Sequence, residues 1–178
     1  MFVGTANRFR SPIAAWFSRR LEREVPIQAW SVGSASIWAE AGLGVAPSPR
    51  WMADELGPDL AAHKAIRIDR QLLNGYHLIL VMEEHQREAL AAESPQFTNR
   101  VFPLAKVAQG VVYDFRESDE LRGRTFVDVA HEVCSLVDTG FQEICLLARR
   151  LEYLALSHGI RRIADTLCNP ASIIRPSA

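Results

Sequence analysis

The chain has 178 residues, of which 48% are hydrophobic and 23% are charged. These values are typical of globular proteins and exclude a disordered chain, a collagen-like repeat and a disulfide-stapled miniprotein. The formal net charge of −1 gives the chain no basic field to attract nucleic acid or anionic lipid. We therefore expect one soluble domain over residues 1–178, with neither nucleic acid nor a membrane as partner.

The first half of the chain alternates short strands and helices. A helix is predicted from Ser11, which can cap it, through residue 25, because Pro12 suits a first helical position and apolar residues then recur at helical spacing. The other elements predicted in this half are a strand at 1–3, a strand over 27–34, a loop over 42–49, a helix over 49–56 and a short helix over 69–73.

The second half begins with the strongest strand prediction, the apolar run at 77–82. Such a run is typical of a parallel strand that is covered on both faces. Strands that alternate with helices predict an α/β fold with a parallel sheet. The elements that follow are a helix over 84–92, a strand over 100–104, an irregular charged segment over 106–127, a long helix over 141–156 and a short helix over 161–168.

The three cysteines, Cys134, Cys145 and Cys168, all follow residue 133. An odd number in a chain that is otherwise poor in cysteine indicates a reducing compartment, and no secretory signal or membrane span precedes them, so we expect a cytoplasmic protein. The neighbouring Thr139 and Gly140 argue against one helix that carries both Cys134 and Cys145. Because no cysteine or histidine pair has the spacing of a metal site, we expect no metal and no other cofactor.

The segment between the first strand and the first helix is the candidate site. Ligands of open α/β sheets bind at the carboxyl ends of strands. A tight turn before a helix directs successive backbone N–H groups toward one point, where they favour an oxyanion, and Arg10 can add a bidentate guanidinium. The alternative is that Arg10 only pairs with an acid at the surface. The predicted oxyanion-binding residues are Thr5, Ala6, Asn7, Arg8, Phe9, Arg10 and Ser11.

The same segment fits the pattern Val-Cys-x-Gly-Asn-x-Cys-Arg-Ser-Pro at Val3, Asn7, Arg10, Ser11 and Pro12. This pattern is the phosphate-binding loop of the low-molecular-weight protein tyrosine phosphatases, which the chain resembles. The resemblance is good over residues 1–105 and weak over 128–156. It implies a four-stranded parallel sheet flanked by helices. Further similar segments lie at 33–42, 59–64 and 78–82.

The chain departs from this family at the residue on which its chemistry depends. Gly4 stands where the family has the cysteine whose thiolate attacks phosphorus, and glycine offers no attacking atom. No base is evident that would activate the neighbouring Thr5. The resemblance places His131 at the position of the general acid, which is an aspartate in the family, with Asp128 and Asp114 as alternates.

Other residues match the parts of the family's site that support the loop. The resemblance implies that Asn7, Ser11, Ser34 and His63 form a hydrogen-bond network that holds the turn open. Trp38 matches a wall of the substrate groove, although a tryptophan that only packs is equally consistent with the pattern.

Three hypotheses for the function follow. The first is a catalytically inactive pseudophosphatase that binds phosphate, sulfate or a phosphoprotein through loop 4–11. The second is a weakly active phosphatase that uses Arg10 and a water molecule in place of a thiolate. The third is a structural or interaction protein whose loop is empty. The sequence predicts no particular oligomeric state.

Overall fold

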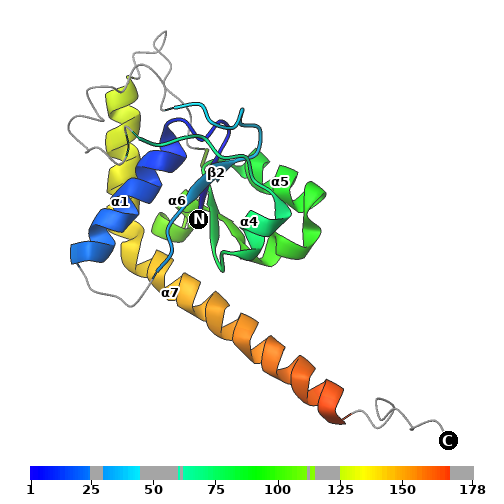
Figure 1. The fold of residues 1–178 in the computed structure, drawn as a ribbon. Coiled ribbons are helices and arrows are strands. Elements are labelled where there is room, and N and C mark those ends of the chain that lie inside the picture. The colour runs from blue at the N-terminus through cyan, green and yellow to red at the C-terminus, as the bar shows by residue number, and fades with distance from the viewer. Residues whose placement is uncertain (25–29, 45–59, 61, 112, 115–124, 169–178) are drawn as a thin grey trace, which may run out of the picture.

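A computed structural model describes residues 1–24, 30–44, 60, 62–111, 113–114 and 125–168. At its centre lies a four-stranded parallel sheet of order β2-β1-β3-β4 (Figure 1). This arrangement confirms the predicted fold class, an α/β fold with a four-stranded parallel sheet flanked by helices. The strands are β1 (Phe2–Gly4), β2 (Ser34–Ser36), β3 (Ile79–Val81) and β4 (Val101–Pro103).

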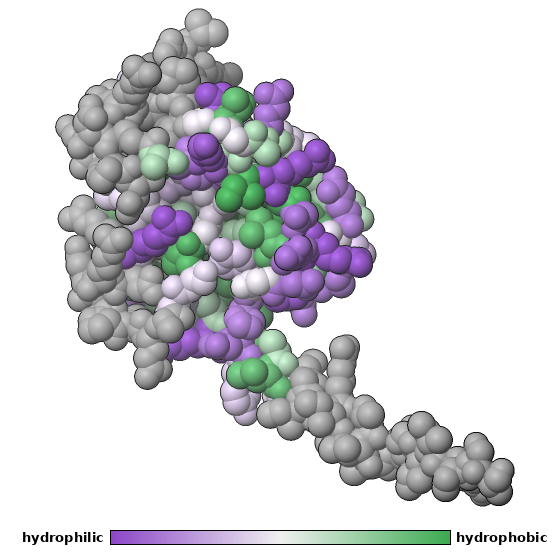
Figure 2. All heavy atoms as spheres, viewed as in Figure 1, coloured by the Kyte–Doolittle hydropathy of each residue, from purple (hydrophilic) through white to green (hydrophobic). Residues whose placement is uncertain are grey.

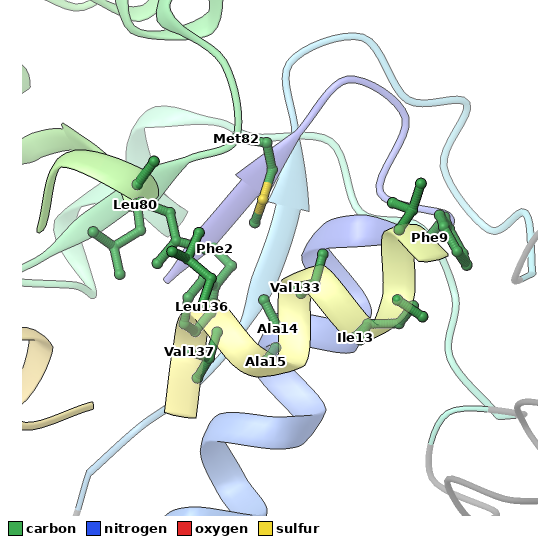
Figure 3. Packing of buried hydrophobic residues seen from close by; sticks show 14 of the residues in the cluster. Phe2, Phe9, Ile13, Ala14, Ala15, Leu80, Met82, Val133, Leu136 and Val137 are labelled. Atoms are coloured by element: carbon green, nitrogen blue, oxygen red, sulfur yellow. The ribbon is translucent and has the colours of Figure 1, made fainter. Parts of the chain in front are cut away.

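Helices cover both faces of the sheet because successive side chains of each strand point to opposite sides. Phe2 packs in the cluster that α1 and α7 cover, whereas its neighbour Val3 packs in the cluster on the other face, which Leu73 of α4 and Leu90 of α5 help to form. Figure 3 shows the first cluster, in which Phe2 and Leu80 from the sheet meet α1 and α7. The helices are α1 (Arg10–Glu24), α4 (Arg70–Asn74), α5 (Glu84–Glu93), the 3-10 helix Pro95–Arg100, α6 (Leu104–Gln109) and α7 (Phe126–Cys168).

The predicted strand over 27–34 is wrong in its position. β2 consists of the small residues Ser34–Ser36, and residues 30–33 form no strand. Pairing with β1 decides this register, since Gly4 lies opposite Ser36. The apolar alternation over 27–34 gave the wrong position because it does not detect a strand made of small residues. The predicted helix over 49–56 lies outside the described residues.

The predicted break before residue 141 is also wrong, because α7 is continuous from Phe126 to Cys168. The hydroxyl of Thr139 donates to the carbonyl of Ser135 at 2.8 Å, which keeps the side chain within the helix. Cys134 and Cys145 therefore share one helix, about 16 Å apart along its axis, which is too far for a disulfide. The segment over 106–127 is not all irregular, since α6 extends to Gln109.

Gly140 permits a close approach of α7 to α6. A Cβ atom built on Gly140 would lie 2.3 Å from the Cβ and 2.6 Å from the Cα of Ala108. The glycine is thus required by packing, which outweighs its poor helix propensity. Within the described ranges, no helix has the length and apolar character needed to cross a membrane.

The contact between α6 and α7 can be tested with Gly140→Ala. In an exposed helix this change would stabilise by about 1 kcal/mol, whereas here the clash with Ala108 should lower the free energy of unfolding by about 2 kcal/mol. Chemical denaturation measures the change. Thr139→Ala, at the adjacent exposed position, is the matched control and should alter stability by less than about 0.5 kcal/mol. A more stable Gly140→Ala variant would contradict the close packing.

Candidate functional site

The loop from Gly4 to Arg10 joins the carboxyl end of β1 to α1, and Asn7 determines its course. Asn7 has a φ of 53°, in the left-handed region that asparagine tolerates better than most residues. Its Nδ2 donates to the Oγ of Ser11 at 3.1 Å, and its Oδ1 accepts from the backbone N–H of Ile66 at 3.0 Å. The buried side chain of Asn7 therefore fixes the turn from both sides. Ala6, which replaces the family's glycine, does not have a positive φ.

His63 completes this clamp through the backbone. Its Nε2 lies 2.8 Å from the carbonyl oxygen of Asn7, so Nε2 carries the hydrogen and donates it. Burial lowers the pKa of His63 below its ordinary value, against the opposing effect of this hydrogen bond, and so favours the neutral ring. The structure thus brings together Asn7, Ser11 and His63, three of the four residues expected to support the loop.

The fourth expected support residue, Ser34, is not part of this network. Ser34 pairs with Phe2, at the opposite end of β1 from the loop, and within the described part of the chain no hydrogen bond joins its side chain to the loop. Ser36 instead lies beside Gly4, is fully buried, and its Oγ has no hydrogen-bond partner among the described residues. Ser34 was expected from the resemblance of segment 33–42, and such a motif does not determine which residue of β2 pairs with which residue of β1.

The backbone N–H groups of residues 5–9 donate no hydrogen bond within the described part of the chain. Some backbone carbonyls at the start of the loop do accept hydrogen bonds, since the carbonyl of Gly4 accepts from the N–H of Ile37 and that of Thr5 from the N–H of Trp38. Unpaired N–H groups in a turn that leads into a helix N-terminus form a site where an oxyanion is favoured.

Two of the loop side chains, those of Arg8 and Phe9, make contacts with other segments of the chain. The Nε of Arg8 donates to the carbonyl of Gly44 at 3.0 Å. The ring of Phe9, which replaces the family's second loop cysteine, packs edge-on against Phe126 at the start of α7, with 5.1 Å between the ring centroids. Neither contact uses a backbone N–H group of the loop.

Arg10 is buried and forms an ion pair with Glu83, which follows β3. The second oxygen of Glu83 lies 3.2 Å from the Nδ1 of His85. The alternative expected for Arg10, pairing with an acid, therefore holds in part, although the acid adjoins the loop and is itself mostly buried. Sequence reasoning missed Glu83. Its signal was an acidic residue directly after a strand that pairs with β1, where carboxyl ends of parallel strands meet.

Gln86 connects the same strand end to the loop. Its side chain is fully buried, its Nε2 donates to the Oγ1 of Thr5 at 3.0 Å, and its Oε1 accepts from the N–H groups of Met82 and Glu83 at 2.9 and 3.2 Å. The Nη2 of Arg10 also lies 3.5 Å from the hydroxyl of Thr5. Both side chains act as donors toward Thr5, and neither is a base that would activate it as a nucleophile.

At Gly4 the backbone does not require glycine, since its φ lies outside the left-handed region. A Cβ built there would lie 3.1 Å from the Oγ of Ser11 and 3.5 Å from its Cβ. A side chain at this position would therefore enter the loop beside the hydroxyl of Ser11, which would have to shift by a few tenths of an ångström. Glycine leaves that space without an attacking atom.

The candidates for the general acid lie in different places. Asp128 is engaged at the start of α7, where its Oδ2 accepts from the N–H and the hydroxyl of Thr125 at 2.8 and 2.7 Å. His131, expected in a loop, is exposed on the second turn of α7 instead. Asp114 accepts from the N–H of Glu84 at 2.8 Å, which places it next to the partner of Arg10. Of the three, Asp114 is the one tied by a described contact to the loop's surroundings.

Trp38 lies at the rim of the site. Its backbone N–H donates to the carbonyl of Thr5 at 3.3 Å, while half of its surface is exposed and its ring stacks on His85, with 6.0 Å between centroids and 8° between planes. An exposed aromatic pair beside an anion site can pack against an aromatic ring of a ligand. Among the described residues, no cluster of His, Cys, Asp or Glu could hold a metal ion.

Comparison with known proteins agrees with this fold and loop. A family model described as low molecular weight phosphotyrosine protein phosphatase matches residues 1–138. The probable low molecular weight protein-tyrosine-phosphatase EpsP of Ralstonia nicotianae is 30% identical over 114 residues, which are 64% of this chain and 75% of that protein.

Two solved structures share the fold. The low molecular weight protein tyrosine phosphatase from T. tengcongensis has a TM-score of 0.70 and 21% identity, and covers 80% of this chain and 96% of its own. The tyrosine phosphatase Wzb from Escherichia coli K30, solved in complex with sulphate, has a TM-score of 0.62 and 22% identity, and covers 84% and 95%. Since the family model spans most of the chain, this chain belongs to the low molecular weight phosphotyrosine protein phosphatase family.

Proposed function

We propose that this chain is a catalytically inactive member of its family, a pseudophosphatase of the cytoplasm, that binds a phosphate-type oxyanion on a partner protein through loop 4–11. The observation that carries the proposal is the clamped loop that begins at Gly4, where the chemistry needs a thiolate. The N–H groups of its residues 5–9 have no hydrogen-bond partner among the described residues. The loop keeps the means to bind an oxyanion and lacks the atom that would attack it.

Inactivity follows from the absence of an alternative nucleophile. Hydrolysis through a phosphoenzyme requires an attacking atom with a base or a lowered pKa. Gly4 has no side chain. The hydroxyl of Thr5 receives one hydrogen bond from Gln86 and lies near the guanidinium of Arg10, and neither group removes its proton. Loss of a nucleophile lowers rates by several orders of magnitude.

Binding follows from the N–H groups and from Arg10. A guanidinium binds two oxygens of a phosphate in a planar, bidentate contact. Glu83 already neutralises Arg10 in part, so an arriving anion competes with this carboxylate and the affinity is moderated. The stacked rings of Trp38 and His85 at the rim favour a phosphate carried on an aromatic group, such as phosphotyrosine.

A second candidate function is weak hydrolysis by a water molecule held beside Arg10. The position of Asp114 favours it, because this carboxylate is hydrogen-bonded next to Glu83 and could act as a general acid or base near the loop. Asp114→Asn distinguishes the two candidates, since it would abolish such turnover and would leave anion binding unchanged.

The first prediction concerns Arg10. Vanadate or phosphate should raise the Tm of the wild-type protein, and Arg10→Ala should weaken the anion affinity about tenfold to a hundredfold, because a charged hydrogen-bond donor is lost. Each ligand-induced shift is measured against the variant's own unliganded Tm. Arg8→Ala is the matched control, since this loop arginine turns toward Gly44 and its removal should leave the shift intact.

Without added vanadate or phosphate, the same proteins should not hydrolyse p-nitrophenyl phosphate above background. Turnover that disappears in Arg10→Ala would overturn the inactive assignment. An anion that fails to stabilise the wild-type protein would instead favour the structural protein with an empty loop.

The second prediction concerns Glu83. Glu83→Gln removes the carboxylate that competes for Arg10, so anion affinity should rise about tenfold while the unliganded protein becomes less stable. Titration calorimetry gives the affinity and thermal unfolding the stability. Glu84→Gln, which breaks the pair with Arg87 on the same helix, should change neither by much. Weaker anion binding in Glu83→Gln would show that the carboxylate supports the site and does not compete with the ligand.

The third prediction concerns Gly4. Gly4→Cys should place a thiol among the N–H groups of the loop and beside Arg10, which together lower a thiol pKa. The variant should therefore react with iodoacetamide at neutral pH far faster than the wild-type cysteines, and should hydrolyse p-nitrophenyl phosphate measurably. Gly4→Ser, of the same size but without a thiolate, should bind anions and show no turnover. A folded Gly4→Cys protein with an unreactive thiol would contradict the oxyanion site.

A further inference from the structure

The C-terminal part of α7 extends beyond the sheet and its covering helices (Figure 1). Leu151 is the last α7 residue that packs against the apolar cluster of the domain. Residues 152–156 are all exposed, so this length of helix has no packed face within the described part of the chain. Isolated helices are marginal in water, and most helical stability in proteins comes from packing of an apolar face.

Large apolar side chains lie exposed on this helix. Leu146, Tyr153 and Leu156 have 61%, 72% and 61% of their surfaces exposed. Figure 2 shows hydrophobic residues gathered at the point where the helix leaves the domain. At 100° per residue these three side chains lie on the side of α7 opposite to Ile144 and Leu151, which pack toward the domain. The helix therefore has a second apolar face that the domain leaves uncovered.

The spacing along this second face identifies what would cover it. With Arg149, the exposed residues fall at 146, 149, 153 and 156, which are intervals of three, four and three. The sequence continues the same intervals with Ile160, Ile163 and Leu167. An apolar repeat of 3.5 residues over three heptads is the pattern by which two helices pack along one seam. We call positions 146, 149, 153, 156, 160, 163 and 167 the outer heptad.

The outer heptad is suited to pairing with the outer heptad of a second copy of this chain. A seam of this kind is self-complementary, so a two-fold axis pairs it with itself without a further surface. All of its positions also lie beyond residue 138, where the match to the family ends, on the part of α7 that extends away from the sheet. We propose that the chain forms a homodimer through a coiled coil of its outer heptads.

The positions of the charged residues argue against a membrane surface. An interfacial helix has its basic residues on the side opposite to its apolar face. Here Arg149 lies within the outer heptad and Arg150 and Glu152 flank it, all three exposed, while Leu154, with 43% of its surface exposed, lies outside the outer heptad. Flanking charges of both signs are typical of a coiled-coil seam.

The test is sedimentation velocity of the full chain from micromolar to sub-millimolar concentration. The wild-type protein should reach the mass of a dimer. Leu156→Glu should weaken association about a hundredfold, since each copy loses a buried leucine and adds a charge to the seam. Ala155→Glu adds the same charge one residue away, outside the outer heptad, and should leave the dimer intact. The circular dichroism spectrum serves as the folding control and should be the same for both variants.

A second variant should strengthen dimerisation, a result that loss of folding would not produce. Arg149→Leu completes the apolar seam and should tighten the dimer about tenfold. A wild-type chain that is monomeric throughout the concentration range would overturn the proposal. So would flotation of a monomeric chain with anionic vesicles of phosphatidylglycerol, which would assign the outer heptad to a membrane surface, or equal dimerisation of Leu156→Glu and wild type.

Discussion

The left-handed turn at Asn7 is the constraint on which the rest of the site depends. One side chain accepts from Ile66 and donates to Ser11, and its carbonyl receives the hydrogen bond of His63. These contacts tie the loop to α1 and to the segment around residues 63–66, so the turn does not collapse onto its own N–H groups. With the turn held in this way, the amides of residues 5–9 are left to face a ligand.

Charge within the site is balanced by the protein itself. Arg10 and Glu83 form a mostly buried pair, which spares the guanidinium the cost of burial without a partner. The pair also means that a ligand gains only the difference between its own contacts and those of the carboxylate. In an enzyme this would limit ground-state binding. Under the proposed function, it would set how tightly a phosphorylated partner is held.

The sequence predicted the fold, the loop and most of the clamp, and it failed where tertiary contacts decide. The apolar run over 77–82, which contains β3, was recognisable because its pattern is local. The clamp residues were recognisable because the family's motifs fix their spacing; they are Asn7, Ser11 and His63. β2 was misplaced because small residues carry no hydrophobic period. The helix break was predicted at Gly140 because helix propensity says nothing of its contact with Ala108. Glu83 and Gln86 became visible only when the sheet brought β3 beside β1.

Under the proposed function, the loop binds an oxyanion and does not transform it. Nuclear magnetic resonance of the amide groups tests both parts, with phosphate titrated into one sample and p-nitrophenyl phosphate into a second sample that is free of phosphate. We expect saturable shifts of the amide signals of residues 5–9 and of the Arg10 guanidinium, with the ester intact after prolonged incubation. Unchanged loop signals at saturating phosphate, or release of p-nitrophenol above the buffer rate, would contradict it.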